Sequence, residues 1–316
     1  MNHTLSLSQL KTHLMGFKYL IVDQSILDLY PQLFLQQAIF SFMALEKNKT
    51  QQSITQLHEF LFTHQIKRHE QVLIMGGGIT LDMAGFAVAT YMRGISFTSV
   101  PTTLLAMVDV CHGGKVGINT SHGKNTIGTF YSPKNVLLCS EFLNTLPWIE
   151  TQNGISEMLK HLIVSGKHHF PEPHLLTQQD AILQSIKIKE TITAQDPHDL
   201  GIRQCLNLGH TLAHAAEITS HYALSHGQAV AWGLLIEGHI LEAENLIHPY
   251  THTLKKYFNA HFQLPSIPAL PMLWQAMQFD KKNTHSVCIS HVTGADVFPT
   301  TYGMWKNALK KAQSCR

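Results

Sequence analysis

The 316-residue sequence lacks the features that mark membrane, secreted and nucleic-acid-binding proteins. No uninterrupted apolar run reaches the roughly 18 residues that a membrane-spanning helix needs. The first 17 residues have neither the basic start nor the long apolar core of a signal peptide. Only 14% of the residues are charged and the formal net charge is +2, which is too balanced to indicate binding to nucleic acid or an anionic membrane. We therefore expect a cytoplasmic protein with small-molecule partners.

Cysteine is scarce as well. The five cysteines form no CxxC pair, and their number is odd; they are Cys111, Cys139, Cys205, Cys288 and Cys315. This pattern predicts reduced thiols in a cytoplasmic compartment rather than a disulfide framework.

The order of the apolar segments predicts two domains. Short apolar runs, expected to be strands, alternate in the first half with helical patterns at 24–37, interrupted by Pro31, and at 51–66; the runs are 17–23, 40–45, 71–75, 95–100 and 135–139. This order indicates a mostly parallel sheet with right-handed crossovers. From about residue 144 the patterns are helical, at 151–165, 176–194, 206–219, 225–246, 250–260 and 269–279, with a minor strand at 287–292. We predict an α/β domain over residues 1–146 and a helical domain over 147–316.

Three consecutive glycines, Gly76 to Gly78, end an apolar run and precede a helical pattern. We place Asp82 in the first turn of that helix. A helix that starts directly after a strand exposes backbone N–H groups at its positive end, which suits a phosphate. Tight strand–helix packing is an alternative explanation, since the pattern is not the G-x-G-x-x-G fingerprint. Asp23 and Glu46 follow predicted strands, where ligands bind to parallel sheets.

Residues 115–125 are predicted to form a loop that binds an anion, because lysines, asparagines and glycines gather there. Six cations, including the two lysines of this loop, lie near glycines or helix ends, although most such side chains are solvated. These candidate cations are Arg93, Lys115, Lys124, Lys160, Lys189 and Arg203.

The second half contains residues suited to a metal. Glu157 lies in a predicted helix, and His210 and His226 each open one. Two imidazoles and a carboxylate leave positions open for water or substrate hydroxyls, as catalytic zinc requires. With 22 histidines in the chain, capping or core roles explain these two histidines more readily when they are considered alone. His210 and His214 could instead form an i, i+4 metal pair, and spacing does not decide between His214 and His226.

Taken together, these motifs resemble those of the 3-dehydroquinate synthases, which are sugar phosphate cyclases. The matching segments are LEKNKT (45–50), GGGITLDMAGFAVATYMRG (76–94), VPTTLLAMVD (100–109), GGKVGINTSHGKNTIGTFYSPK (113–134), SEMLKH (156–161), GIRQCLNLGHTLAHAAE (201–217), SHGQAVAWG (225–233) and DKKN (280–283). The chain departs from the family at Leu81, Val116 and Gln228, where glycine, threonine and glutamate are usual.

The resemblance implies a role for each matching residue. NAD would be bound by Asp23, Glu46, Lys49, Gly77, Gly78, Ile79, Asp82, Thr102, Thr103, Asp109, Lys124, Phe142 and Thr145. Zinc, or alternatively cobalt, would be bound by Glu157, His210 and His226. The substrate would be bound by Lys115, Asn125, Lys160, Lys189, Arg203, Asn207, His214 and Lys282. Arg93 would reach into the neighbouring site of a homodimer.

The resemblance also implies a lyase reaction of the shikimate pathway, which leads to chorismate and the aromatic amino acids. The substrate, 3-deoxy-D-arabino-heptulosonate 7-phosphate, would become 3-dehydroquinate with loss of phosphate, through transient oxidation by NAD and an aldol closure. The alternatives are a metal-dependent polyol or glycerol dehydrogenase, another sugar phosphate cyclase, and a non-catalytic relative.

Overall fold

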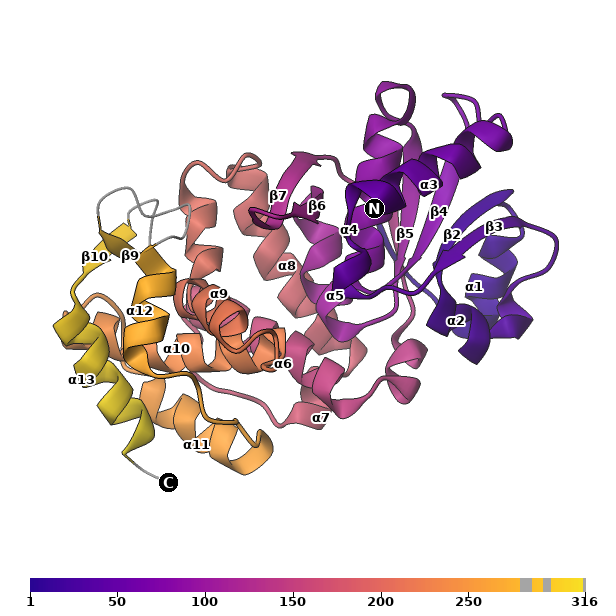
Figure 1. The fold of residues 1–316 in the computed structure, drawn as a ribbon. Helices are drawn as coiled ribbons and strands as arrows, with labels where there is room; N and C mark the ends of the chain where they lie inside the picture. The colour runs from indigo at the N-terminus through magenta and orange to yellow at the C-terminus, as the bar shows by residue number, and fades with distance from the viewer. Residues whose placement is uncertain (279–285, 292–296, 315–316) are drawn as a thin grey trace. The chain divides into compact units, whose positions relative to one another are not determined.

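The computed structural model describes residues 1–278, 286–291 and 297–314. The chain divides into two compact units, Met1–Pro147 and Trp148–Arg316 (Figure 1). None of the helices among the described residues is both long and apolar enough to cross a membrane.

The first unit is built on a six-stranded parallel sheet in the order β1-β8-β5-β4-β2-β3. Its strands are β1 (Asn2–Thr4), β2 (Tyr19–Asp23), β3 (Ala38–Phe42), β4 (Gln71–Gly76), β5 (Ser96–Pro101) and β8 (Asn135–Leu138). The strands β2 and β4 are continuous apolar runs because both faces of the sheet are covered. The predicted mostly parallel sheet is confirmed.

Helices connect these strands. The α-helices are α1 (Leu7–Leu14), α2 (Gln24–Leu29), α3 (Gln51–Thr63), α4 (Gly78–Thr90) and α5 (Leu104–Val108). Short 3-10 helices are η1 (Pro31–Leu33), η2 (Glu46–Asn48), η3 (Tyr91–Arg93), η4 (Val110–His112) and η5 (Ser140–Thr145). The predicted interruption at Pro31 is confirmed, since α2 ends at Leu29 and proline cannot continue its hydrogen bonds. The predicted extent to residue 37 is too long, because η1 ends at Leu33.

The loop predicted over residues 115–125 is wrong. The segment forms an antiparallel hairpin of β6 (Lys115–Thr120) and β7 (Gly123–Phe130). Val116 and Ile118 of β6 are buried, and β6 packs against α4. The glycines that indicated a loop instead allow the two strands to approach closely.

The second unit is mainly helical, which confirms the predicted change of architecture. Its helices are α6 (Trp148–Val164), α7 (Pro173–Leu176), α8 (Gln179–Gln195), η6 (Ile202–Asn207), α9 (His210–Thr219), α10 (His226–Ala243), α11 (Thr251–His261), α12 (Leu270–Gln278) and α13 (Tyr302–Gln313). The strands β9 (Val287–Ser290) and β10 (Val297–Thr300) pair antiparallel. The helix predicted over 176–194 starts at Gln179, since α7 is a separate turn that begins at Pro173.

Helix α10 is the centre of this unit. It contacts α6, α9, α11 and α13, and it is apolar on most of its circumference. Residues on α10 therefore determine how its neighbours are placed.

Candidate functional site

The proposed cofactor residues of the first unit follow the carboxyl ends of the parallel strands. Asp23 ends β2, Glu46 and Lys49 follow β3, and Gly77 follows β4. Thr102 and Thr103 follow β5, while Phe142 and Thr145 lie in η5 after β8. Ligands bind at this edge of open parallel sheets, because crossovers leave a crevice there. The topology thus brings the predicted residues to one edge of the sheet.

The turn between β4 and α4 offers backbone donors. Gly77 is the N-cap of α4, no side chain caps this helix end, and Gly78 and Ile79 form its first turn. Free N–H groups at a helix start suit an anion. Leu81 is 4% exposed, so its side chain belongs to the core. Asp82 is the fifth residue of α4, so the prediction that it lies in the first turn is wrong.

Asp82 belongs instead to a buried ion pair with Lys49. The Lys49 ammonium lies 2.6 Å from Asp82 Oδ2 and 2.6 Å from Asn125 Oδ1. Lys49 is 3% exposed. Burial raises the pKa of Asp82, although the Lys49 charge opposes this rise. Lys49 therefore links η2, α4 and the hairpin.

Lys49→Met is expected to destabilise the protein by about 2–3 kcal/mol. The change leaves Asp82 without its cation, and breaking a fully buried pair costs roughly 3–5 kcal/mol. Asp82 keeps 20% of its side-chain exposure, which reduces the loss. Urea unfolding of Lys49→Met measures the effect, and the control is Lys47→Met, which changes an exposed lysine of η2 two residues earlier. Equal midpoints in the two variants would show that the ion pair contributes nothing.

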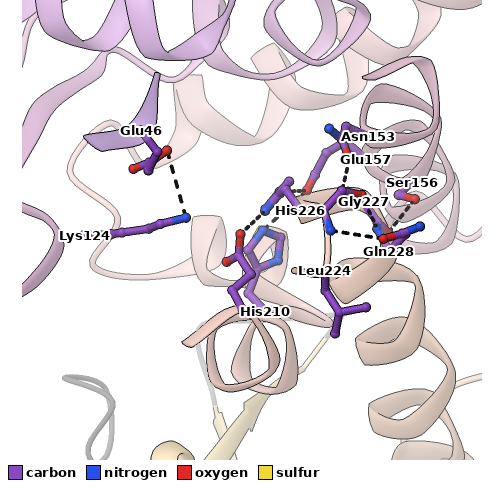
Figure 2. A network of polar contacts seen from close by, with 12 residues as sticks. Glu46, Lys124, Asn153, Ser156, Glu157, His210, Leu224, His226, Gly227 and Gln228 are labelled. Atoms are coloured by element: carbon purple, nitrogen blue, oxygen red, sulfur yellow. Dashed lines mark hydrogen bonds and ion pairs between the residues drawn. The ribbon is translucent and has the colours of Figure 1, made fainter. Parts of the chain in front are cut away.

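Asn119 is a residue of this cluster that the sequence analysis missed. Its Nδ2 donates to Glu46 Oε1 at 2.6 Å, and its Oδ1 accepts from the Asn125 backbone N–H at 2.9 Å. Lys124 Nζ lies 4.0 Å from Glu46 Oε2 (Figure 2). Asn119 belongs to the motif at residues 113–134, but nothing in the sequence distinguishes it from its polar neighbours.

The remaining candidates of the first unit are mostly held by local contacts. Asp23 Oδ1 accepts from the Ser25 backbone N–H at 3.0 Å and so caps α2. Thr103 caps α5, and Asp109 ends that helix. Thr102 is buried, and its N–H donates to the Gly76 carbonyl at 3.0 Å. These contacts keep polar groups at the strand ends.

The last candidates of this unit differ in exposure. Phe142 is buried against the Tyr30 ring, and Thr145 Oγ1 lies 2.7 Å from the Tyr30 hydroxyl. Lys115 and Arg93 are exposed, and Arg93 has a left-handed φ of 63°. Arg93 thus stands on a strained surface turn.

Three side chains of the second unit converge from three helices. Glu157 of α6, His210 of α9 and His226 of α10 have ligand atoms that all lie within 4.8 Å of one another. Glu157 Oε1 lies 3.1 Å from His226 Nε2 and 3.4 Å from His210 Nε2. Figure 2 shows the three groups pointing toward one another. Among the described residues, His214 belongs to no group of ligand atoms this close.

The spacing of these atoms fits a metal ion. Zinc bonds of about 2.0–2.2 Å at tetrahedral angles separate two ligand atoms by roughly 3.3–3.6 Å. Burial and the Lys160 charge lower the pKa of His210 to about 4, so this imidazole is neutral and able to bind a metal. Burial would raise the pKa of Glu157, but Lys160 and His210 outweigh it and hold the pKa well below its usual range. The donor set is therefore one that a zinc site requires.

Outer contacts hold His226 in place. The Oε1 atom of Glu217, on α9, lies 3.7 Å from His226 Nδ1. Burial would lower the pKa of His226, but Glu157 and Glu217 raise it to about 10, so a bound metal would take the place of the Nε2 proton. A carboxylate behind a ligand imidazole fixes the ring and its tautomer. Glu217 was missed, although it lies seven residues after His210 and so on the same helical face.

The backbone next to His226 is also clamped. Asn153 Oδ1 accepts from the Gly227 N–H at 2.7 Å, and Ser156 Oγ donates to the Gly227 carbonyl at 2.9 Å. A Cβ on Gly227 would lie 2.5 Å from Asn153 Cα, so this contact between α6 and α10 requires glycine. Gln228 completes a capping box with Ser225, a role that glutamate also performs. Figure 2 shows Asn153, Ser156, Gly227 and Gln228 near His226.

Three of the predicted cations of the second unit are buried. Lys160 of α6 forms an ion pair with Glu157, and Lys189 of α8 and Arg203 of η6 are buried. Asp196 shapes the turn before Arg203, because it accepts the N–H groups of Leu200, Gly201 and Arg203. Asn207 ends η6, and His214 lies half-buried on α9. Lys282 lies outside the described residues.

Comparisons with known proteins give one consistent family. Residues 39–153 match the family model described as 3-dehydroquinate synthase N-terminal, and residues 154–283 match 3-dehydroquinate synthase C-terminal. The 3-dehydroquinate synthase of Chlamydia pneumoniae is 35% identical over 88% of this chain and 81% of its own length. That of Chlamydia abortus is 41% identical over 72% of this chain, and that of Pelagibacter ubique 42% over 62%. The match covers less than two thirds of the length of these last two relatives, 62% of the Chlamydia abortus protein and 57% of the Pelagibacter ubique protein.

Solved structures share the fold. A 2-epi-5-epi-valiolone synthase of Streptomyces hygroscopicus with NAD+ and Zn2+ bound has a TM-score of 0.83 at 18% identity and covers 100% of this chain and 97% of its own. A 2-deoxy-scyllo-inosose synthase with carbaglucose-6-phosphate, NAD+ and Co2+ has 0.83 at 21%, covering 98% and 96%. A probable glycerol dehydrogenase of Sinorhizobium meliloti is less similar, with 0.66 at 14%, covering 99% and 96%.

Proposed function

Because this chain belongs to the 3-dehydroquinate synthase family, we propose that it converts 3-deoxy-D-arabino-heptulosonate 7-phosphate to 3-dehydroquinate and phosphate. The observation that carries the proposal is the set of Glu157, His210 and His226, whose ligand atoms lie within 4.8 Å of one another. The reaction makes the protein a carbon–oxygen lyase of the shikimate pathway. Its product leads to the aromatic amino acids.

The proposed substrate carries a phosphate and a carboxylate, so it needs cations with little access to water. Lys160, Lys189 and Arg203 are 2%, 6% and 4% exposed. Buried cations bind anions more strongly than solvated ones, because water screens them less. Asp196 accepts the Arg203 backbone N–H at 3.2 Å, and Arg203 Nη1 donates to the Pro197 carbonyl at 2.9 Å, which holds the guanidinium in place. The amide of Asn207 and the imidazole of His214 supply hydrogen bonds to the sugar hydroxyls.

NAD and a divalent metal complete the proposal. NAD would take up and return a hydride, and zinc, or alternatively cobalt, would polarise the neighbouring substrate hydroxyls. The N–H groups at the start of α4 would bind the pyrophosphate. Asp23 and Glu46 are acceptors suited to ribose hydroxyls, and Asn119 holds Glu46 in position. Two related cyclases contain NAD+ with Zn2+ or Co2+, which supports this choice.

A homodimer is also proposed, with Arg93 reaching the neighbouring site. Arg93 is exposed and follows Met92, which has a left-handed φ of 48°. Strain of this kind persists where surrounding contacts impose it. The Tyr91 hydroxyl supplies two such contacts, since it donates to the Leu61 and Ile66 carbonyls at 3.2 and 3.1 Å. The turn therefore holds Arg93 outward.

Phosphate release from the heptulosonate phosphate tests the function. Purified protein is expected to release phosphate when NAD+ and zinc are supplied, and to lose this activity after chelation and regain it with zinc or cobalt. NADH should not accumulate, because the cofactor is regenerated. Metal-loaded, folded protein that releases no phosphate would refute the proposal. Accumulation of NADH with polyols would favour the dehydrogenase, and turnover of another sugar phosphate alone would favour a sister cyclase.

A further inference from the structure

Helix α9 begins at the predicted ligand His210, but it has no cap from its own sequence. The residue before it is Gly209, with a left-handed φ of 82° and no side chain to accept a hydrogen bond. The first N–H groups of a helix need partners when they are buried. Here the partner comes from another helix.

Glu237 of α10 supplies that partner. Its Oε2 accepts the Gly209 N–H at 2.7 Å, and its Oε1 accepts the Leu212 N–H at 3.0 Å. Glu237 is 0% exposed. A buried carboxylate on backbone N–H groups at a helix start is favoured by charge-assisted hydrogen bonds and by the helix dipole. The Glu237 carboxylate thus binds the backbone N–H groups of Gly209 and Leu212, the residues that flank His210 and Thr211.

The two helices also touch directly at this point. A Cβ on Gly233 would lie 1.9 Å from the Gly209 carbonyl oxygen, so the backbones of α9 and α10 are in contact. Gly233 and Glu237 are four residues apart and therefore lie on one face of α10. That face fixes both the position and the direction of the start of α9.

We propose that Glu237 is a positioning residue for the metal site. This inference rests on the proposed function. Helix α10 carries His226 at its first residue and Glu237 three turns later. Through Glu237, α10 sets the backbone from which the His210 ring extends. The two contacts described for Glu237 go to backbone N–H groups, of Gly209 and Leu212, and not to a ligand side chain. It acts on the metal through the geometry of His210.

The same helix provides a matched control. Glu242 of α10 accepts the N–H groups of Tyr250 and Thr251 at 2.7 and 2.8 Å, and so caps α11 in the same way. It also accepts the Thr251 hydroxyl at 2.6 Å. No residue of α11 is a candidate ligand. Loss of either cap removes a similar hydrogen-bond pattern, but only the cap of α9 adjoins the metal residues.

Glu237→Gln and Glu242→Gln test the proposal. A glutamine keeps one acceptor and turns an N–H group toward a backbone N–H, so each variant loses part of its cap. Metal-free full-length wild type and variants are titrated with Co2+ alone, and the absorbance of the bound ion and the dissociation constant are recorded. Thermal unfolding of the metal-free proteins measures the loss of stability.

We expect Glu237→Gln to bind Co2+ roughly 10–100-fold more weakly and with an altered spectrum, as for other losses of outer support. Glu242→Gln should lose comparable stability and keep its Co2+ affinity and spectrum. Glu237→Asp, which retains the charge but is shorter, should bind with intermediate affinity, and it carries the test if Glu237→Gln does not fold.

Two results would overturn the proposal. The first is that Glu237→Gln binds Co2+ as wild type does; if that variant does not fold, the same result with Glu237→Asp counts. The second is that the Glu237 and Glu242 variants weaken Co2+ binding equally. Wild type that binds no Co2+ would instead overturn the metal site of the proposed function, and this inference with it. The wild-type titration therefore separates the two failures.

Discussion

His226→Ala is expected to abolish metal binding and phosphate release together. The change leaves Glu157 and His210, two ligands where a catalytic zinc site has three. The loss should exceed the roughly 10–100-fold that removal of an outer partner costs. It also leaves Glu217 without the imidazole that its carboxylate faces at 3.7 Å. Metal content of purified protein and phosphate release in the presence of NAD+ measure the effect.

The control for this variant is His252→Ala. His252 is exposed on α11, and alanine suits a helix, so metal content and activity should stay at the wild-type level. Unchanged metal content in His226→Ala would refute the ligand assignment. It would favour the alternative pair of His210 and His214, which lie on one helix with ring centroids 5.6 Å apart.

Gly233→Ala is expected to destabilise the protein by about 3 kcal/mol or more. Overpacking of a core usually costs roughly 1–3 kcal/mol, and this case lies at the upper end. The added Cβ would meet the oxygen, carbonyl carbon and Cα of Gly209 at 1.9, 2.6 and 2.7 Å. These are backbone atoms, so no side-chain rotation relieves the clash. The start of α9 must move, and metal affinity should fall as well.

Urea unfolding of the metal-free protein measures this loss. The control is Gly303→Ala on α13, where the nearest atom to an added Cβ is Thr301 Oγ1 at 3.9 Å. In that open position alanine should stabilise the helix by up to about 1 kcal/mol. A midpoint for Gly233→Ala equal to that of wild type would show that α9 and α10 are not in backbone contact.

Local patterns predicted much of the fold. The strand that ends at Gly76 and the helix that follows it depend on neighbouring residues, and both form as expected. The hairpin of β6 and β7 was missed because its stability comes from β6 packing on α4, a contact between distant segments. The interruption at Pro31 formed as expected, because proline cannot continue the helical hydrogen bonds, but the helical structure ends at Leu33 and does not reach residue 37.

Within the candidate site, only residues that stand in recognisable motifs could be predicted from the sequence. Spacing alone could not choose between His214 and His226, since that choice depends on where α10 begins relative to α9. Asn119, Glu217 and Glu237 were missed for the same reason. Each acts through a partner that the tertiary structure supplies, and a single polar residue in a helix or strand gives no local sign of it.

The cap that Glu237 provides has a consequence for the order of folding. Helix α9 has ten residues and no cap of its own, so it is too short to be stable in isolation. Helix α10 has 18 residues and a capping box, so it can form earlier. Substitutions in α10 should therefore slow folding, whereas those in α9 should mainly speed unfolding. We therefore expect His210 to join Glu157 and His226 after the transition state, which φ-values near zero for substitutions in α9 would show. A nascent chain would then gain its metal site late.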